Sequence, residues 1–229
     1  MNKILRYIKR LLDRLLGDFS DEMFWKYLHF SKNKWKKAYE VPYNKLGHKF
    51  FLIDLITSNK KIKKILELGC GDGLNLRKIA KKNKSIDLTG IDINKVAIKK
   101  GYLKIKNLNY KINLIRGNLK NLRKYTNNQF DIVFTDASLM YIDESNILDV
   151  LKEALRISKL KVVICELHTN KNSFYNDKWV HNYEIIFKKI SKYNKVKIYN
   201  LKNSKRAGDW KTFGKIIEVK KILKKNLII

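Results

Sequence analysis

The chain is poor in cysteine and lacks long apolar runs, and both shortages restrict what it can be. Cys70 and Cys165 are the only cysteines in 229 residues, which supports neither a disulfide framework nor a zinc site. No uninterrupted apolar stretch approaches the ~18 residues that span a bilayer. Charged residues interrupt the apolar residues of the N-terminus, so we expect no signal peptide. We therefore expect a globular protein of the reducing cytoplasm, without a metal.

Arginine is also scarce, although the chain is strongly basic. Lysine and arginine together number 51 against 21 acidic residues, a formal net charge of +30, yet only eight of the 51 are arginine. Arginine makes the bidentate contacts with bases and phosphates that nucleic-acid surfaces commonly use. Lysine, asparagine and isoleucine all have A/T-rich codons, so genome composition alone accounts for abundant lysine. We interpret the charge mainly as solvated surface, and nucleic acid is a partner that we do not favour.

The first fifty residues carry two patterns. Residues 2–17 place apolar side chains at helical spacing with basic residues opposite, which predicts an amphipathic helix. We favour packing of this helix on its own domain or on a partner subunit, and peripheral contact with an anionic membrane is the alternative. Residues 22–50 mix aromatic residues with lysines, and a helix is predicted from about 44 to 57. We interpret this segment as a cap over a pocket or as ordinary core, with base stacking as the alternative.

From residue 62 onward, strand-like and helix-like segments alternate. Strand patterns cover 62–68, 86–91, 111–116, 130–135, 161–167, 195–201 and 214–220, and helical patterns are clearest at 74–82, 94–101 and 145–158. This alternation predicts an α/β fold with a Rossmann-like, seven-stranded, mostly parallel sheet and helices on both faces. The last two strands follow each other without a predicted helix between them, so we expect an antiparallel terminal hairpin at one edge.

The first of these strands ends in a glycine-rich turn. Glu67 precedes three glycines at alternate positions, and glycine lets a backbone turn tightly and approach a ligand. These glycines are Gly69, Gly71 and Gly73. The helix after the turn offers free N–H groups to a carboxylate, and Glu67 offers an acceptor to an ammonium group. A zwitterionic methionine tail fits this combination better than a pyrophosphate, because Leu74 stands where a dinucleotide-binding turn has its third glycine.

Polar residues end the next strands, at what should be the same edge of the sheet. Asp92 follows Gly73 by 19 residues, close to the ~20 expected of an acid that accepts ribose hydroxyls. Capping the next helix is its alternative role, although Asn94 is able to fill that role. Asn118 ends the third strand and is a candidate for the adenine edge or an ordinary turn residue. Asp136 ends the fourth strand and should face the same crevice.

Residues 62–168 resemble the class I S-adenosylmethionine-dependent methyltransferases, especially the small single-domain enzymes with an E-x-G-x-G-x-G turn. The resemblance implies that S-adenosyl-L-methionine is the cofactor. It assigns the methionine part to Glu67 and the three glycines, the ribose to Asp92 and the adenine to Asn118. The family usually has aspartate at this last position, so Asn118 is a departure. The implied organisation is an N-terminal helical extension or cap at 1–58 and a methyltransferase domain at 59–229.

The single proline, Pro42, narrows the methyl acceptor. The Asn-Pro-Pro-Tyr or Asp-Pro-Pro-Tyr loop of enzymes that methylate amino groups of DNA or glutamine is absent, as is the Pro-Cys pair of cytosine C5 methylation. We therefore expect methyl transfer to an oxygen or nitrogen of a small-molecule or glycan acceptor. His168, just after the fifth strand, is the best candidate for a general base, with a satisfied loop histidine as the alternative. Tyr141 is a candidate for lining the acceptor pocket.

Two other functions compete with this one. An RNA methyltransferase would keep the fold and the cofactor and would use the lysine surface as a binding track. A non-catalytic, membrane-peripheral scaffold would bind the cofactor and use residues 2–17 to contact lipid.

Overall fold

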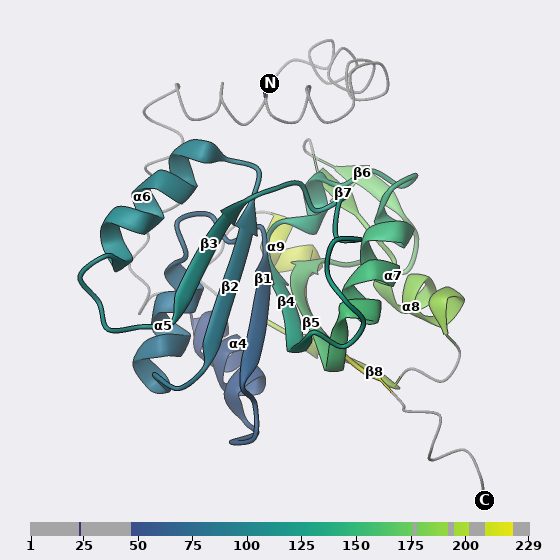
Figure 1. Cartoon of the computed structure of the whole chain (residues 1–229). Helices are drawn as coiled ribbons and strands as arrows, with labels where there is room; N and C mark the ends of the chain where they lie inside the picture. The colour runs from purple at the N-terminus through teal and green to yellow at the C-terminus, as the bar shows by residue number, and fades with distance from the viewer. Residues whose placement is uncertain (1–22, 24–46, 176–177, 192–194, 202–208, 222–229) are drawn as a thin grey trace, which may run out of the picture.

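The computed structural model describes residues 23, 47–175, 178–191, 195–201 and 209–221 (Figure 1). The helix predicted at 2–17 and most of the aromatic segment at 22–50 lie outside these residues. The predicted division into 1–58 and 59–229 therefore stays a prediction.

A seven-stranded sheet forms the centre of the fold, in the order β3-β2-β1-β4-β5-β9-β8 (Figure 1). Five neighbouring strands, from β3 to β5, are parallel, and β9 runs against both of its neighbours. The strands are β1 (Lys64–Leu68), β2 (Asp87–Asp92), β3 (Ile112–Arg116), β4 (Phe130–Asp136), β5 (Ser158–Leu167), β8 (Lys195–Asn200) and β9 (Gly214–Lys220). The predicted α/β sheet with an antiparallel end is confirmed.

Two details of the terminal region differ from the prediction. A one-turn helix, α9 (Asp209–Phe213), directly precedes β9, where no helix was expected. A small hairpin of β6 (Ser173–Tyr175) and β7 (Lys178–Val180) lies beyond the carboxyl ends of the parallel strands (Figure 1). A single helical turn and strands of three residues are too short to show a periodic apolar pattern. β9 lies between β5 and β8, in agreement with a hairpin at one edge, and β8 is the edge strand.

Helices cover both faces of the sheet, because alternate residues of each buried strand point to opposite sides. One face carries α4 (Gly47–Thr57), α5 (Leu74–Lys82) and α6 (Lys95–Ile105). The other carries α7 (Ile147–Ile157) and α8 (Tyr183–Ile190). α6 continues past the predicted end at 101 to Ile105, and Gly101 lets the helix approach the glycine-rich turn. A Cβ at Gly101 would lie 2.8 Å from the carbonyl oxygen of Asp72.

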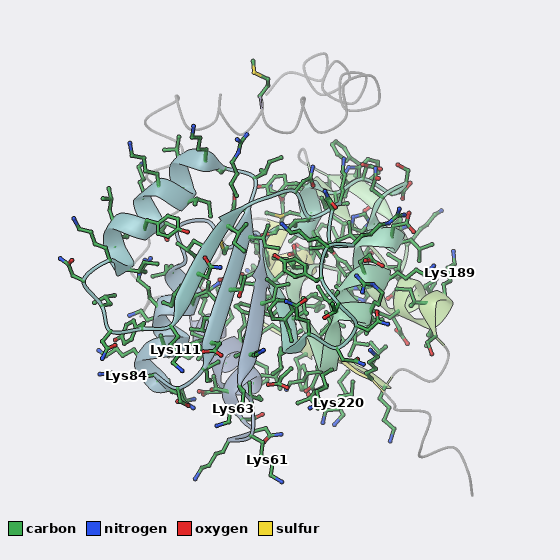
Figure 2. The ribbon with its side chains drawn as sticks, in the orientation of Figure 1. Lys61, Lys63, Lys84, Lys111, Lys189 and Lys220 are labelled. Carbon is green, nitrogen blue, oxygen red and sulfur yellow. The ribbon has the colours of Figure 1, made fainter. Side chains whose placement is uncertain are left out.

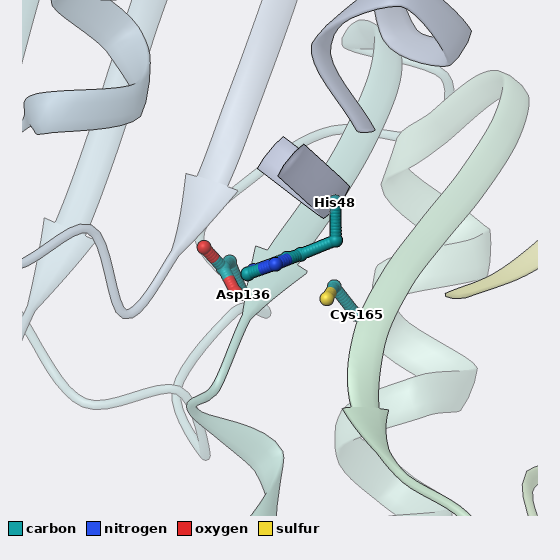
Figure 3. Close-up of side chains that lie close together, drawn as sticks. All are labelled: His48, Asp136 and Cys165. Carbon is teal, nitrogen blue, oxygen red and sulfur yellow. The ribbon is translucent and has the colours of Figure 1, made fainter. Parts of the chain in front are cut away.

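α4 belongs to the same core as the helices that follow it. Its Leu52, Ile53 and Ile56 are buried with residues of β1 and α5. The first turn of α4 lies near the carboxyl ends of β4 and β5, where polar side chains gather (Figure 3). In the described part of the chain, no helix combines the length and apolar character needed to cross a membrane.

Glu166, near the end of β5, holds the loop that follows β4. One of its carboxylate oxygens accepts hydrogen bonds from the backbone N–H groups of Ser138 at 2.7 Å and Leu139 at 2.9 Å, and from the hydroxyl of Thr135. Ala137 in this loop has a φ of +64°, a left-handed conformation that needs support from its surroundings. The side chain of Glu166 is fully buried, and this burial raises its pKa to about 7.

The substitution Glu166→Gln should remove a pH dependence of stability. Since the pKa of Glu166 is about 7 in the folded chain against a usual 4.5, its contribution to stability is complete below pH 4.5 and is lost as the pH rises through 7. The difference corresponds to roughly 3 kcal/mol. Glutamine keeps an oxygen for the same three donors and carries no charge. Urea denaturation at pH 5 and pH 8 should therefore show that the variant gains stability relative to the wild type at the higher pH.

Glu144→Gln is the matched control, because Glu144 is exposed and its removal changes the net charge by the same amount. The control should follow the wild type at both pH values. Parallel pH curves for the wild type and Glu166→Gln would contradict the assignment of this titration to Glu166.

Candidate functional site

The turn between β1 and α5 needs its three glycines for conformational reasons. Gly69, Gly71 and Gly73 have φ values of +71°, +55° and +74°, a region that residues with a Cβ rarely adopt. Gly69 is also crowded, because a Cβ there would lie 2.0 Å from the hydroxyl oxygen of Ser138. The same hydroxyl lies 3.2 Å from the carbonyl oxygen of Gly69 and donates to it. The loop supported by Glu166 thus contacts the glycine turn directly.

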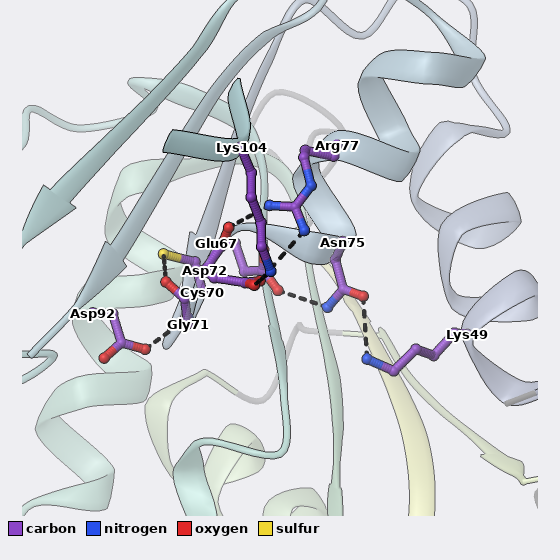
Figure 4. Close-up of polar contacts among 9 residues, drawn as sticks. All are labelled: Lys49, Glu67, Cys70, Gly71, Asp72, Asn75, Arg77, Asp92 and Lys104. Carbon is purple, nitrogen blue, oxygen red and sulfur yellow. Dashed lines mark hydrogen bonds and ion pairs between the residues drawn. The ribbon is translucent and has the colours of Figure 1, made fainter. Parts of the chain in front are cut away.

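Charged side chains fix the outer side of this turn (Figure 4). The carboxylate of Asp72 forms ion pairs with Lys104 of α6 and with Arg77 of α5. Arg77 also donates to the carbonyl oxygen of Asp72. Because Gly73 precedes α5 directly, the first free N–H groups of that helix lie at the turn. These groups make the turn a suitable place for an anionic group.

Asp92 is bound to the glycine turn by backbone hydrogen bonds. One carboxylate oxygen accepts from the N–H of Gly71 at 2.7 Å, and the other accepts from the N–H of Asn94 at 2.8 Å. Asn94 caps α6 through the N–H groups of Val96 and Ala97, so Asp92 is not needed as the cap. A carboxylate has about four acceptor positions, and two of them stay available for hydroxyl groups. Burial raises the pKa of Asp92, and the two backbone bonds oppose that rise.

Asn118 lies beside Asp92, because the N–H of Gly117 donates to the carbonyl oxygen of Asp92 at 3.0 Å. The side-chain oxygen of Asn118 accepts from the N–H of Lys120 at 2.9 Å, which fixes the orientation of the amide. Its amide nitrogen is buried and has no hydrogen-bond partner among the described residues. A buried donor of this kind suits an acceptor nitrogen of adenine, whereas an aspartate would accept from the adenine amino group. The departure from the family pattern is thus compatible with a base at this position.

A network of polar side chains connects the turn to β4 and α4 (Figure 4). Asn75, in the first turn of α5, donates to Glu67 at 2.7 Å and to Asp136 at 3.4 Å. Lys49 of α4 lies 2.9 Å from the carboxylate of Asp136 and donates to the side-chain oxygen of Asn75 at 3.4 Å. The second oxygen of Glu67 is buried and has no partner among the described residues. Burial, and to a lesser degree the charge of Asp136, raise the pKa of Glu67 well above its usual value.

The residues at this edge fit a nucleoside cofactor with an amino-acid tail. The unpartnered oxygen of Glu67 is an acceptor for an ammonium group, which would favour the ionised carboxylate. The start of α5 offers N–H groups to a carboxylate. On the neighbouring strands, Asp92 at the end of β2 offers an acceptor, and Asn118 after β3 offers a donor. The predicted residues of the cofactor site therefore lie along one edge of the sheet, on adjoining loops.

His48, Asp136 and Cys165 have buried side chains that lie close together (Figure 3). The imidazole of His48 and the thiol of Cys165 are of the kinds that transition metals bind. One candidate ligand atom of each lies within 4.8 Å of the other two. The ammonium group of Lys49, however, lies 2.9 Å from the carboxylate of Asp136. A metal ion would share that carboxylate with a second cation, and like charges at this separation repel strongly in a buried site. We therefore assign Asp136 to the ion pair.

His168 lies at the end of β5, among aromatic side chains. Its ring stacks on Tyr183 with the ring centroids 6.2 Å apart, and its backbone N–H donates to the carbonyl oxygen of Phe213 at 2.8 Å. The side-chain atom Nδ1 is buried and has no partner among the described residues. Burial lowers the pKa of His168, which favours the neutral ring. Its catalytic role stays a prediction.

Tyr141 closes the short helix η2 (Leu139–Tyr141) after β4. It packs on a small apolar group at the carboxyl ends of β4 and β5, which includes Met140, Leu167 and Val180. The hairpin β6–β7 adds aromatic pairs nearby, including Phe174 with Trp179 at a centroid distance of 4.9 Å. This aromatic region lies at the carboxyl end of β4, on the side away from Asn118. The lining role of Tyr141 stays a prediction.

Sequence reasoning missed several members of this edge. Asn75 and Glu166 offered a local signal, because each is a polar residue at a position that the periodic pattern buries. Lys49 and His48 offered none, because their contacts are with residues far along the chain. The structure brings His48 next to Asp136.

Comparison with known proteins agrees with this geometry. Residues 65–161 match the family model described as a methyltransferase domain. A tRNA (guanine-N(7)-)-methyltransferase from Mycoplasma capricolum subsp. capricolum is 28% identical over 155 residues, which cover 56% of this chain and 67% of that protein.

Two solved structures show the same fold. Geranyl diphosphate C-methyltransferase from Streptomyces coelicolor A3(2) superposes with a TM-score of 0.62 at 13% identity, over 77% of each chain. Phosphoethanolamine N-methyltransferase 2 from Haemonchus contortus superposes with a TM-score of 0.62 at 14% identity, over 77% of this chain and 53% of the other. Residues 65–161 therefore belong to a methyltransferase domain, and the chain shares the fold of the two S-adenosylmethionine-dependent enzymes.

Proposed function

We propose that the chain transfers the methyl group of S-adenosyl-L-methionine to an oxygen or nitrogen of a small-molecule or glycan acceptor. The observation that carries this proposal is the pair of buried, unpartnered polar atoms on either side of Asp92. The free oxygen of Glu67 accepts from the ammonium group of the methionine tail, and the free amide nitrogen of Asn118 donates to the adenine. The cofactor supplies an electrophilic methyl group on a sulfonium.

The glycine turn and Asp92 hold the rest of the cofactor. Gly69, Gly71 and Gly73 let the backbone approach the methionine part without a side chain in the way. Asp92 accepts the ribose hydroxyls with the positions that its backbone bonds leave available. Asp136, which faces Glu67 across Asn75, adds negative charge at the end of the cofactor that carries positive charge.

His168 takes the proton that the acceptor loses. Its neutral ring and its unpartnered Nδ1 favour this role. Tyr141 and the aromatic side chains of β6–β7 border the acceptor side, which suits a small organic molecule or a sugar ring. The fold itself leaves the acceptor open, since the two solved structures come from enzymes that act on chemically different substrates, a prenyl diphosphate and a phosphorylated ethanolamine.

An RNA acceptor is the second candidate, and the tRNA-modifying relative is the observation that favours it. Five of the exposed lysines lie away from the methyl group. Lys61, Lys63, Lys84 and Lys111 precede β1, β2 and β3, and Lys220 ends the antiparallel β9 (Figure 2). All five therefore lie at the edge of the sheet opposite to the glycine turn. Other exposed lysines, such as Lys95 at the start of α6 and Lys104 beside Asp72, lie at the cofactor edge, so the choice between the two acceptors rests on the experiment below.

Asp92→Ala should weaken binding of the cofactor. The substitution removes a charged acceptor of hydrogen bonds, and such bonds contribute on the order of 1.5–3 kcal/mol. Calorimetric titration with S-adenosylmethionine should show a dissociation constant raised by about tenfold to a hundredfold.

Asp87→Ala is the control, because Asp87 lies on the same strand at the far edge, where it pairs with Lys111 at 3.6 Å. Its affinity should equal that of the wild type. An unchanged dissociation constant for Asp92→Ala would refute the assignment of the ribose to Asp92.

A second experiment separates the two acceptor classes. The chain is incubated with methyl-labelled S-adenosylmethionine and, in parallel, with the small-molecule fraction and the RNA fraction of the cells that make it. We expect label in a small molecule or glycan and none in RNA. Label in RNA, together with an RNA affinity that falls steeply with salt between about 50 and 200 mM, would overturn the small acceptor and support the RNA candidate.

A further inference from the structure

Lys49 places a positive charge among the acids at the methionine end of the pocket. Its side chain is only 11% exposed and that of Asp136 is 1% exposed, and the two groups lie 2.9 Å apart. Figure 4 shows Lys49 reaching from α4 to Asn75, which in turn binds Glu67. The ammonium group therefore contacts the carboxylate of Asp136 directly and is linked to that of Glu67 through Asn75.

This position matters because the two carboxylates are buried and close to each other. Buried charges destabilise a fold unless they are paired. The charge of Asp136 raises the pKa of Glu67, and the charge of Lys49 lowers it. Lys49 thus supplies, from within the chain, the positive charge that these acids require when no ligand is bound.

The methyl donor and its product differ in charge at this point. S-adenosylmethionine carries a sulfonium in addition to its ammonium and carboxylate groups, whereas S-adenosylhomocysteine has an uncharged thioether. A lysine that neutralises the acids reduces the attraction of the pocket for a sulfonium and leaves the attraction for a thioether almost unchanged.

We propose that Lys49 determines how strongly the pocket distinguishes the charged methyl donor from its uncharged product. This inference rests on the proposed function, since it assumes that the methionine end binds next to Glu67 and Asp136. Lys49 competes with the sulfonium for the two carboxylates and so lowers the preference for the donor. The same repulsion favours methyl transfer, because the reaction removes the charge from the sulfur.

The test compares Lys49→Met with Lys82→Met. Lys82 also pairs with an acid, Asp54, but it lies at the end of α5 away from the glycine turn and its side chain is 49% exposed, so water screens its charge. Dissociation constants for S-adenosylmethionine, S-adenosylhomocysteine and 5′-methylthioadenosine are measured by calorimetry on the full chain. For Lys49→Met, we expect the affinity for S-adenosylmethionine to rise about tenfold relative to that for S-adenosylhomocysteine. Lys82→Met should keep the wild-type ratio.

Two results would overturn the proposal. The first is that Lys49→Met keeps the wild-type ratio of the affinities for S-adenosylmethionine and S-adenosylhomocysteine. The second is that both affinities fall together, while the affinity for 5′-methylthioadenosine, which lacks the amino-acid part, is unchanged. The latter result would make Lys49 a ligand of the cofactor carboxylate. If Lys49→Met fails to fold, Lys49→Gln removes the charge, keeps a hydrogen-bond donor and is judged by the same ratio. A wild-type chain that binds none of the three ligands would instead refute the proposed function.

Discussion

The arrangement of the cofactor edge depends on how three buried carboxylates are paired. Glu67, Asp136 and Glu166 end or nearly end three adjacent parallel strands, where water cannot solvate them. Each has a different kind of partner: an amide for Glu67, an ammonium for Asp136, and two backbone N–H groups with a hydroxyl for Glu166. Because buried charges without partners are costly, these contacts determine where α4, α5 and the loop after β4 can lie.

The three acids differ in role: Glu166 supports a loop, whereas Glu67 and Asp136 contribute charge to the proposed pocket. Glu166 accepts three hydrogen bonds from the loop after β4, and that loop contacts Gly69 through Ser138. It acts on the pocket only through the shape of the glycine turn. Glu67 and Asp136 lie where we propose the methionine end of the cofactor, and Lys49 of α4 pairs with Asp136 there. In this proposal, the affinity of the pocket for a cationic ligand depends on two opposing effects. The two carboxylates attract the ligand, and the ammonium group of Lys49 repels it.

Local sequence was enough to predict the glycine-rich turn and the mostly parallel sheet. The turn from Glu67 to Gly73 and its partner Asp92 lie within one strand–helix–strand unit, and their spacing reflects the geometry of that unit. The alternation of apolar strands and amphipathic helices gave the fold class for the same reason. The helical pattern recognised at 94–101 is four residues shorter at its end than α6, in which Gly101 packs closely on Asp72.

Contacts between segments far apart in the chain could not be predicted from the sequence. Lys49 meets Asp136 only because α4 packs on the sheet, and no spacing rule connects the two positions. Glu166 did carry a signal, since it is an acid in an otherwise apolar, buried strand. The hairpin β6–β7 has strands of three residues, too short for any alternation to be recognised.

The most direct test of the cofactor pocket is a titration of the full, ¹⁵N-labelled chain with S-adenosylhomocysteine, followed by the backbone amide signals in NMR. The account predicts that the largest shifts occur at Gly69, Gly71 and Gly73, at Asn94 beside Asp92, and at Asn118. Saturable binding that leaves these amides unshifted, or that shifts those of the opposite edge around Lys63 and Lys111, would contradict it.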